Sequence, residues 1–168
     1  MLGALKNQLR MMAVDSKDSF TSVIRGLVGP REAMHYERPV RQMILAMPEM
    51  IAQISTWSHD PRHFHSMKRL HGFVLITLYN FKPDHKKGLV GYVEDAYLVA
   101  SAYHRTLNER DRPRLRLRVD NAVPSKSVAE WIETTKQLFP DETRKLDQIL
   151  DELGQKRGRR KEAKMESE

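Results

Sequence analysis

The chain contains no cysteine, and this absence removes several classes of function. Disulfide frameworks, thiolate nucleophiles and zinc sites built on cysteine are all excluded. A long apolar segment is also missing, because the longest run, residues 72–79, is far shorter than the roughly 20 residues that a membrane-spanning helix needs. No continuous apolar stretch follows Lys6 and Arg10, as it would in a signal peptide. A cytoplasmic protein is therefore expected.

Helical spacing of apolar residues dominates what is present. The 168 residues suffice for one compact domain, and the recurring three- and four-residue spacing predicts an all-α fold of about five to seven helices. The expected helices cover residues 1–15, 17–28, 40–58, 66–79, 89–107, 125–138 and 140–153. Residues 30–39 are predicted to be a linker closed by Pro39, and Gly154 is predicted to end the last helix.

Four segments follow from this pattern. They are N-terminal amphipathic helices with a linker (1–39), a helical core (40–108), an extended segment with two further helices (109–154) and a disordered basic tail (155–168). Within the core, the helices at 66–79 and 89–107 are predicted to form a central hairpin around a Pro-Asp turn.

Three acidic residues, Asp84, Glu94 and Asp95, lie at or after that turn. Adjacent residues on a helix point about 100° apart, so Glu94 and Asp95 cannot share one proton as a catalytic pair. An acid on an apolar helix needs a partner, for which a cation from residues 68–71 or the backbone amides of the turn are available. A structural role is predicted, and the alternative is a metal-dependent or carboxylate-using enzyme centred on these three acids.

Histidines are frequent between residues 59 and 71, where four of the seven in the chain occur. Their spacing contains no His-Glu-x-x-His and no pair of ligands four residues apart on a well-defined helix. No metal ion and no cofactor are therefore assigned.

The net charge of +7 comes from two segments. Between residues 105 and 118, six arginines stand against two acids, and between residues 156 and 168, six basic residues stand against three acids. These excesses of four and three charges account for the whole of the +7, so the rest of the chain is close to neutral. Strongly basic segments of this kind are typical of proteins that meet anionic partners.

The first basic segment also has a two-residue period. Arginines alternate with proline, leucine and valine from residue 112 to residue 119, which predicts an extended segment with the arginines on one face. The residues predicted to bind an anionic partner are Arg112, Arg114, Arg116, Arg118, Arg157, Arg159 and Arg160. Nucleic acid and an anionic membrane surface fit the charge equally, and a protein partner is left open. The predicted function is a non-enzymatic binding or adaptor protein; besides the enzyme above, a structural self-associating protein is the alternative.

The middle of the chain resembles the YkvA-like family of small bacterial domains of unknown function. The resemblance rests on Met47-Pro48-Glu49-Met50, Asp60-Pro61-Arg62, the apolar helix from Lys68 to Tyr79, and Pro83-Asp84 followed by Gly91-Tyr92-Val93-Glu94-Asp95-Ala96. It covers residues 47–104 and departs from the family at Lys86-Lys87, where a second Pro-Asp is usual, and at Glu94, where the family has aspartate. The resemblance implies a helical fold and no established activity.

Overall fold

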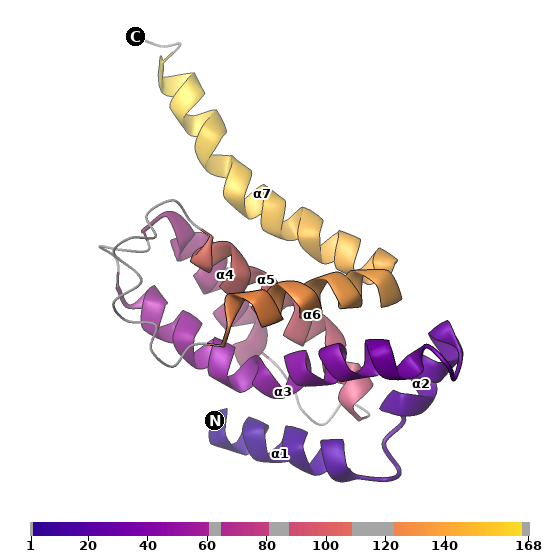
Figure 1. Cartoon of the computed structure of the whole chain (residues 1–168). Coiled ribbons are helices and arrows are strands. Elements are labelled where there is room, and N and C mark those ends of the chain that lie inside the picture. The colour runs from indigo at the N-terminus through magenta and orange to yellow at the C-terminus, as the bar shows by residue number, and fades with distance from the viewer. Residues whose placement is uncertain (1, 61–64, 81–87, 109–122, 166–168) are drawn as a thin grey trace.

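Seven α-helices and two short 3₁₀ turns make up the part of the chain that the structure describes (Figure 1). The structure, a computed structural model, describes residues 2–60, 65–80, 88–108 and 123–165, with residue 65 and residues 155–165 described as backbone only. The elements are α1 (Leu2–Val14), α2 (Phe20–Val28), α3 (Ala33–Ser58), η1 (His65–Met67), α4 (Lys68–Tyr79), η3 (Leu89–Tyr92), α5 (Val93–Leu107), α6 (Ser125–Leu138) and α7 (Pro140–Met165). These described ranges contain no strand, so the prediction of an all-α domain is confirmed.

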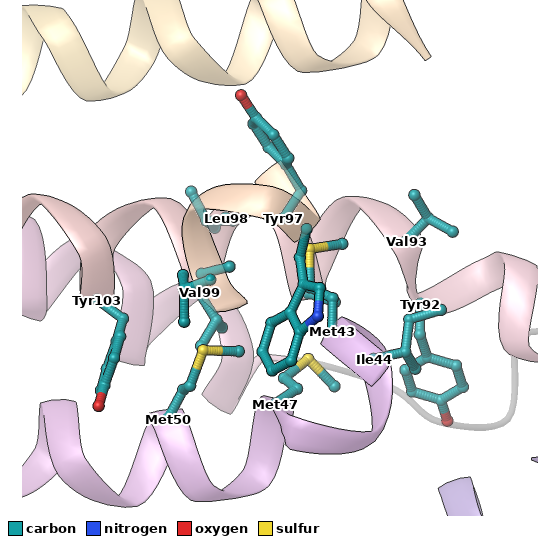
Figure 2. Packing of buried hydrophobic residues seen from close by; sticks show 14 of the residues in the cluster. Met43, Ile44, Met47, Met50, Tyr92, Val93, Tyr97, Leu98, Val99 and Tyr103 are labelled. Carbon is teal, nitrogen blue, oxygen red and sulfur yellow. The ribbon is translucent and has the colours of Figure 1, made fainter. Parts of the chain in front are cut away.

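Helix α5 lies at the centre of the domain and packs against α3, α4, α6 and α7. Eleven of its fifteen residues are buried. Val99 of α5 and Met43, Met47 and Met50 of α3 belong to the same buried core, and Figure 2 shows Val99 beside Met50. Unbranched methionines adapt to irregular gaps between helices, so this stripe fills the core as its helical spacing predicts.

The prediction of a linker at residues 30–39 is wrong, because most of these residues are helical. Helix α3 begins at Ala33 and passes through both Pro39 and Pro48, which are buried. A proline inside a helix loses one backbone hydrogen bond and destabilises the helix by about 3 kcal/mol. In α3 a long stripe of buried side chains offsets this loss, because tertiary packing supplies most of the stability of helices in proteins.

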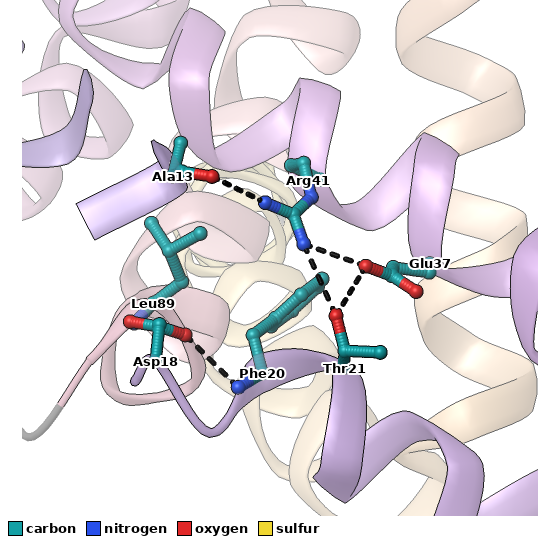
Figure 3. Close-up of polar contacts among 7 residues, drawn as sticks. All are labelled: Ala13, Asp18, Phe20, Thr21, Glu37, Arg41 and Leu89. Atoms are coloured by element: carbon teal, nitrogen blue, oxygen red, sulfur yellow. Dashed lines mark hydrogen bonds and ion pairs between the residues drawn. The ribbon is translucent and has the colours of Figure 1, made fainter. Parts of the chain in front are cut away.

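The N-terminal helices are held to α3 by a half-buried arginine (Figure 3). The Arg41 guanidinium donates hydrogen bonds to the Ala13 carbonyl at 3.0 Å and to Glu37 at 2.6 Å, and it lies 5.1 Å from the centre of the Phe20 ring. Thr21 donates to the same Glu37 carboxylate at 2.6 Å. One charged side chain therefore connects α1, α2 and α3.

Asp18 connects this region to the start of η3. One carboxylate oxygen accepts a hydrogen bond from the Phe20 amide at 2.9 Å, and the other accepts one from the Leu89 amide at 3.0 Å. Gly88, which precedes Leu89, has φ of 71° and ψ of −176°. A β-carbon added at Gly88 would lie 2.7 Å from Asp18 Oδ2, so glycine permits both the backbone conformation and the close approach.

Gly88→Ala is expected to lower the free energy of unfolding by about 2 kcal/mol, because this region of φ and ψ is essentially restricted to glycine. Gly72→Ala is the matched control: its β-carbon meets nothing within 4 Å, and the exchange favours α4 by up to about 1 kcal/mol. Urea unfolding of both variants measures the difference. Equal stabilities would contradict this account of the Asp18–Gly88 contact.

Helix α7 does not end at Gly154, as the sequence predicts, but continues to Met165. The predicted disordered tail from residue 155 is therefore helical as far as Met165. Figure 1 shows the last turns of α7 extending beyond the other helices. A glycine inside a helix lowers the stability of the helix by only about 1 kcal/mol relative to alanine. Good helix formers precede and follow Gly154.

Within residues 2–60, 65–80, 88–108 and 123–165, no helix combines the length and the apolar character that crossing a bilayer requires.

Candidate functional site

A cleft of about 350 Å³ lies between the start of α4, the end of α5 and the middle of α7. It is lined by Ser66, Met67, Leu70, His104, Arg105, Asn108, Leu150, Leu153 and Gly154. Four of these side chains are aliphatic or thioether groups, and they come from α4 with η1 on one side and from α7 on the other. The polar side chains belong mainly to the last turn of α5.

Two polar contacts order the α5 side of the cleft. Arg105 Nη1 lies 2.8 Å from Asp151 Oδ1 of α7. The Asn108 amide nitrogen lies 3.2 Å from each ring nitrogen of His104, one turn earlier in α5. Arginine carries five N–H donors, so the ion pair with Asp151 leaves N–H groups that can donate hydrogen bonds to a second anion. The cleft therefore has a cation at one wall and amide and imidazole groups beside it.

Both ends of the arginine-rich segment 109–122 attach to the same end of α5. The segment begins after Asn108, which lines the cleft, and the chain is described again from Val123. The Val123 carbonyl accepts a hydrogen bond of 3.0 Å from the buried Tyr103 hydroxyl, and burial raises the pKa of Tyr103 to about 12. Arg112, Arg114, Arg116 and Arg118 themselves lie outside the described residues, so their predicted extended conformation stays a prediction.

The second basic segment leaves the body at the same cleft. Gly154 lines the cleft, and the basic residues of α7 begin two positions later. Segments that lie about 40 residues apart in the sequence are thus attached to opposite walls of one cleft. This convergence is a property of the fold, because it depends on α7 lying against α4 and α5.

The helical register of α7 arranges its basic positions on one side. At 3.6 residues per turn, Arg157, Arg160, Lys161 and Lys164 fall within an arc of about 100°. This arc coincides with the side that carries the buried Leu150, which faces the body. Arg159, predicted as part of the same site, lies on the opposite side of the helix from Leu150. These four positions, named here the basic stripe, thus continue the helical register of Leu150, while the side chains from residue 155 onward lie outside the described part of the structure.

A polar seam fixes the position of α7 on the body. Tyr97 points from α5 toward α7 (Figure 2), and its hydroxyl lies 2.8 Å and 3.0 Å from the two carboxylate oxygens of Asp147. Lys136 of α6 lies 3.7 Å from the same carboxylate. Burial, followed by the hydrogen bond and charge of Asp147, raises the pKa of Tyr97 above its usual range, and Ser101 and Arg105 oppose this only in part. Tyr97 therefore remains a neutral donor that holds α7 in place.

The structure describes two of the three acidic residues, Glu94 and Asp95. Asp84 lies outside the described residues, Glu94 is exposed and Asp95 is half-buried. The charge of Asp95 acts, after burial, to raise the pKa of the buried Tyr92 one turn earlier. Glu94 and Asp95 occupy the first turn of α5, where carboxylates interact favourably with the helix dipole. This position favours the predicted structural role for the two acids.

His71 occupies a structural position in the core. His71 is fully buried and its ring stacks on Trp57 at a centroid distance of 6.0 Å. Its Nε2 lies 2.9 Å from the Thr106 hydroxyl, which donates to the Ala102 carbonyl at 2.8 Å. Because the hydroxyl proton is used there, Nε2 must donate to Thr106, which fixes the tautomer. Among the residues with described side chains, no three histidine or acidic residues are grouped as metal ligands would be.

The sequence alone did not identify the cleft. Its walls come from residues 66–70, 104–108 and 150–154, which approach one another only through the packing of α4, α5 and α7. The signal available was indirect: both basic segments begin at the C-terminal end of an apolar helical stretch. No family model, curated protein or solved structure matches the chain. The resemblance to the YkvA-like family accordingly stays a prediction.

Proposed function

We propose that this protein is a non-enzymatic nucleic-acid-binding protein whose binding surface is the basic end of the fold. The basic end consists of the cleft, the segment 109–122 and the stripe of α7 from Arg157 to Lys164. One observation carries the proposal: Asn108 and Gly154, from which the two basic segments extend, line a single cleft. Converging cations raise the local potential far more than the same charges spread over a surface.

The composition of α7 favours the phosphates of a nucleic acid over a lipid surface as the ligand. A helix that lies in a membrane interface needs an apolar face to bury among the lipid chains. Between residues 155 and 165 the apolar residues are only Ala163 and Met165, apart from Gly158. A stripe of arginine and lysine with no apolar counterpart suits the phosphates of a nucleic acid, which are contacted from the side.

The proposal is tested by fluorescence anisotropy of labelled RNA and DNA oligonucleotides with the purified full-length chain. Binding is expected at about 50 mM salt and should weaken by more than about 100-fold at 200 mM, because each phosphate contact releases counterions. Vesicles of anionic lipid, measured by sedimentation, serve as the comparison. No binding of either oligonucleotide at about 50 mM salt, or binding to vesicles alone, would overturn the proposal.

A further inference from the structure

We infer that the outward face of α4 binds the same face of a second copy of this chain, with the two helices antiparallel about a twofold axis. The inference does not depend on the proposed function and concerns a different surface. At 3.6 residues per turn, six residues of α4 lie on the side opposite its buried residues. These residues, named here the α4 face, are Lys68, Arg69, Gly72, Phe73, Ile76 and Tyr79.

The middle of the α4 face is apolar and open to solvent. Helix α4 packs on α3, α5 and α7, and its buried side carries Leu70 and Val74. On the opposite side, Ile76 is 64% exposed and Tyr79 is 76% exposed. The two side chains lie on neighbouring turns, together with the half-buried Phe73. Single exposed apolar residues are common, whereas a contiguous group on one helix is typical of an interaction surface.

The charges at the ends of α4 favour a second copy as the partner. The helix begins with Lys68 and Arg69, has no acid in its first turn and has no basic residue in its last turn. Cations are unfavourable at a helix N-terminus and favourable at a C-terminus. An antiparallel copy of α4 brings the two cations of each chain to the C-terminal carbonyls of the other. Each helix thus supplies the charge that the other lacks, and a parallel arrangement would instead bring the four cations together.

The sequence of the α4 face is complementary to itself in this arrangement. With the twofold axis near the middle of the helix, Ile76 of each copy lies against Gly72 of the other. A β-carbon at Gly72 meets nothing within 4 Å, and the absence of a side chain lets the two backbones approach. Lys68 lies near Tyr79 of the other copy, whose ring attracts a cation. The twofold axis repeats each of these contacts, as an isologous interface requires.

Sedimentation equilibrium of the purified full-length chain, without nucleic acid, tests this inference. The 19.6 kDa chain is expected to dimerise with a Kd on the order of 100 µM, because one helix face is at the low end of interface sizes. Ile76→Lys should raise this Kd more than about 10-fold, since it buries an unpaired ammonium group on each side of the axis. Tyr79→Lys should also raise the Kd, because it places a cation opposite Lys68. It gives α4 a favourable C-terminal charge, so it keeps the test valid if Ile76→Lys does not fold.

Met34→Lys is the matched control, with the same substitution at an apolar position that is 78% exposed. Figure 1 shows the start of α3, which contains Met34, on the opposite side of the fold from α4. At about 150 mM salt this variant should keep the wild-type Kd within about 2-fold, because distant charges are screened. A wild-type chain that is still monomeric at about 1 mM would overturn the inference. A wild-type Kd in Ile76→Lys, or an equal loss of dimer in Met34→Lys, would also overturn it.

Discussion

Replacing the basic stripe of α7 is expected to weaken nucleic-acid binding by about 100-fold or more at low salt. The variant carries alanine at Arg157, Arg160, Lys161 and Lys164. Alanine is the strongest helix former, so α7 keeps its length while four cations are lost. For duplex DNA the slope of log K against log salt should fall by about 0.9 for each phosphate contact removed. Anisotropy titrations at several salt concentrations measure both effects.

Three exposed arginines at the other end of the molecule provide the control. Arg25 lies on α2, Arg31 just before α3 and Arg38 in its second turn. Figure 1 shows α2 and the start of α3 on the opposite side of the fold from α4. Alanine at these three positions should change the affinity less than about 3-fold, since charges beyond a Debye length are largely screened. If both variants lose affinity equally, binding follows net charge and the basic end has no special role.

Acid is expected to destabilise the fold through His71. Burial lowers the pKa of His71 from 6.5 to about 4, so between these values the unfolded chain binds one more proton than the folded protein. Stability therefore rises with pH across this window, is complete above 6.5 and is lost as the pH falls toward 4. The full loss from this one group is about 3 kcal/mol. Urea unfolding at pH values between 7 and 4.5 measures it.

Two variants isolate this contribution. His71→Gln removes the titrating ring and should flatten the fall in stability below pH 6.5, whatever its effect at neutral pH. His35→Gln, at an exposed position of α3, is the matched control for the substitution itself. An unchanged acid profile in His71→Gln would show that His71 is not held neutral in the core.

Helical periodicity was sufficient to predict most of the fold. The spacing of apolar residues located α1, α2, α4, α5 and α6 closely, because each has one face buried against its neighbours. The failures occurred where a local signal competes with packing. Pro39 is read as a helix boundary, yet it lies inside α3, and Gly154 is read as a helix end, yet α7 continues for eleven residues. Proline and glycine each destabilise a helix, and the sequence alone does not show whether burial of the neighbouring side chains outweighs that cost.

The sequence was sufficient to predict which segments of the candidate site carry positive charge, but not how these segments are arranged in space. The two basic segments follow directly from composition, but nothing in their sequence indicates that Asn108 and Gly154 line one cleft. That result depends on the seam between Tyr97 and Asp147 and on the burial of Leu150, which set α7 across α5. Contacts between residues about 50 positions apart carry no periodic signal, so they appear only in the folded chain.

The proposed function requires one end of the fold to gather both basic segments into a single binding surface. Amide NMR of the labelled protein, titrated with a single-stranded oligonucleotide, tests this directly. Chemical-shift changes are predicted in three places together: the cleft walls around Leu70 and His104, segment 109–122 and the α7 stripe. Changes confined to one basic segment, or centred on α1 and α2, would contradict the account.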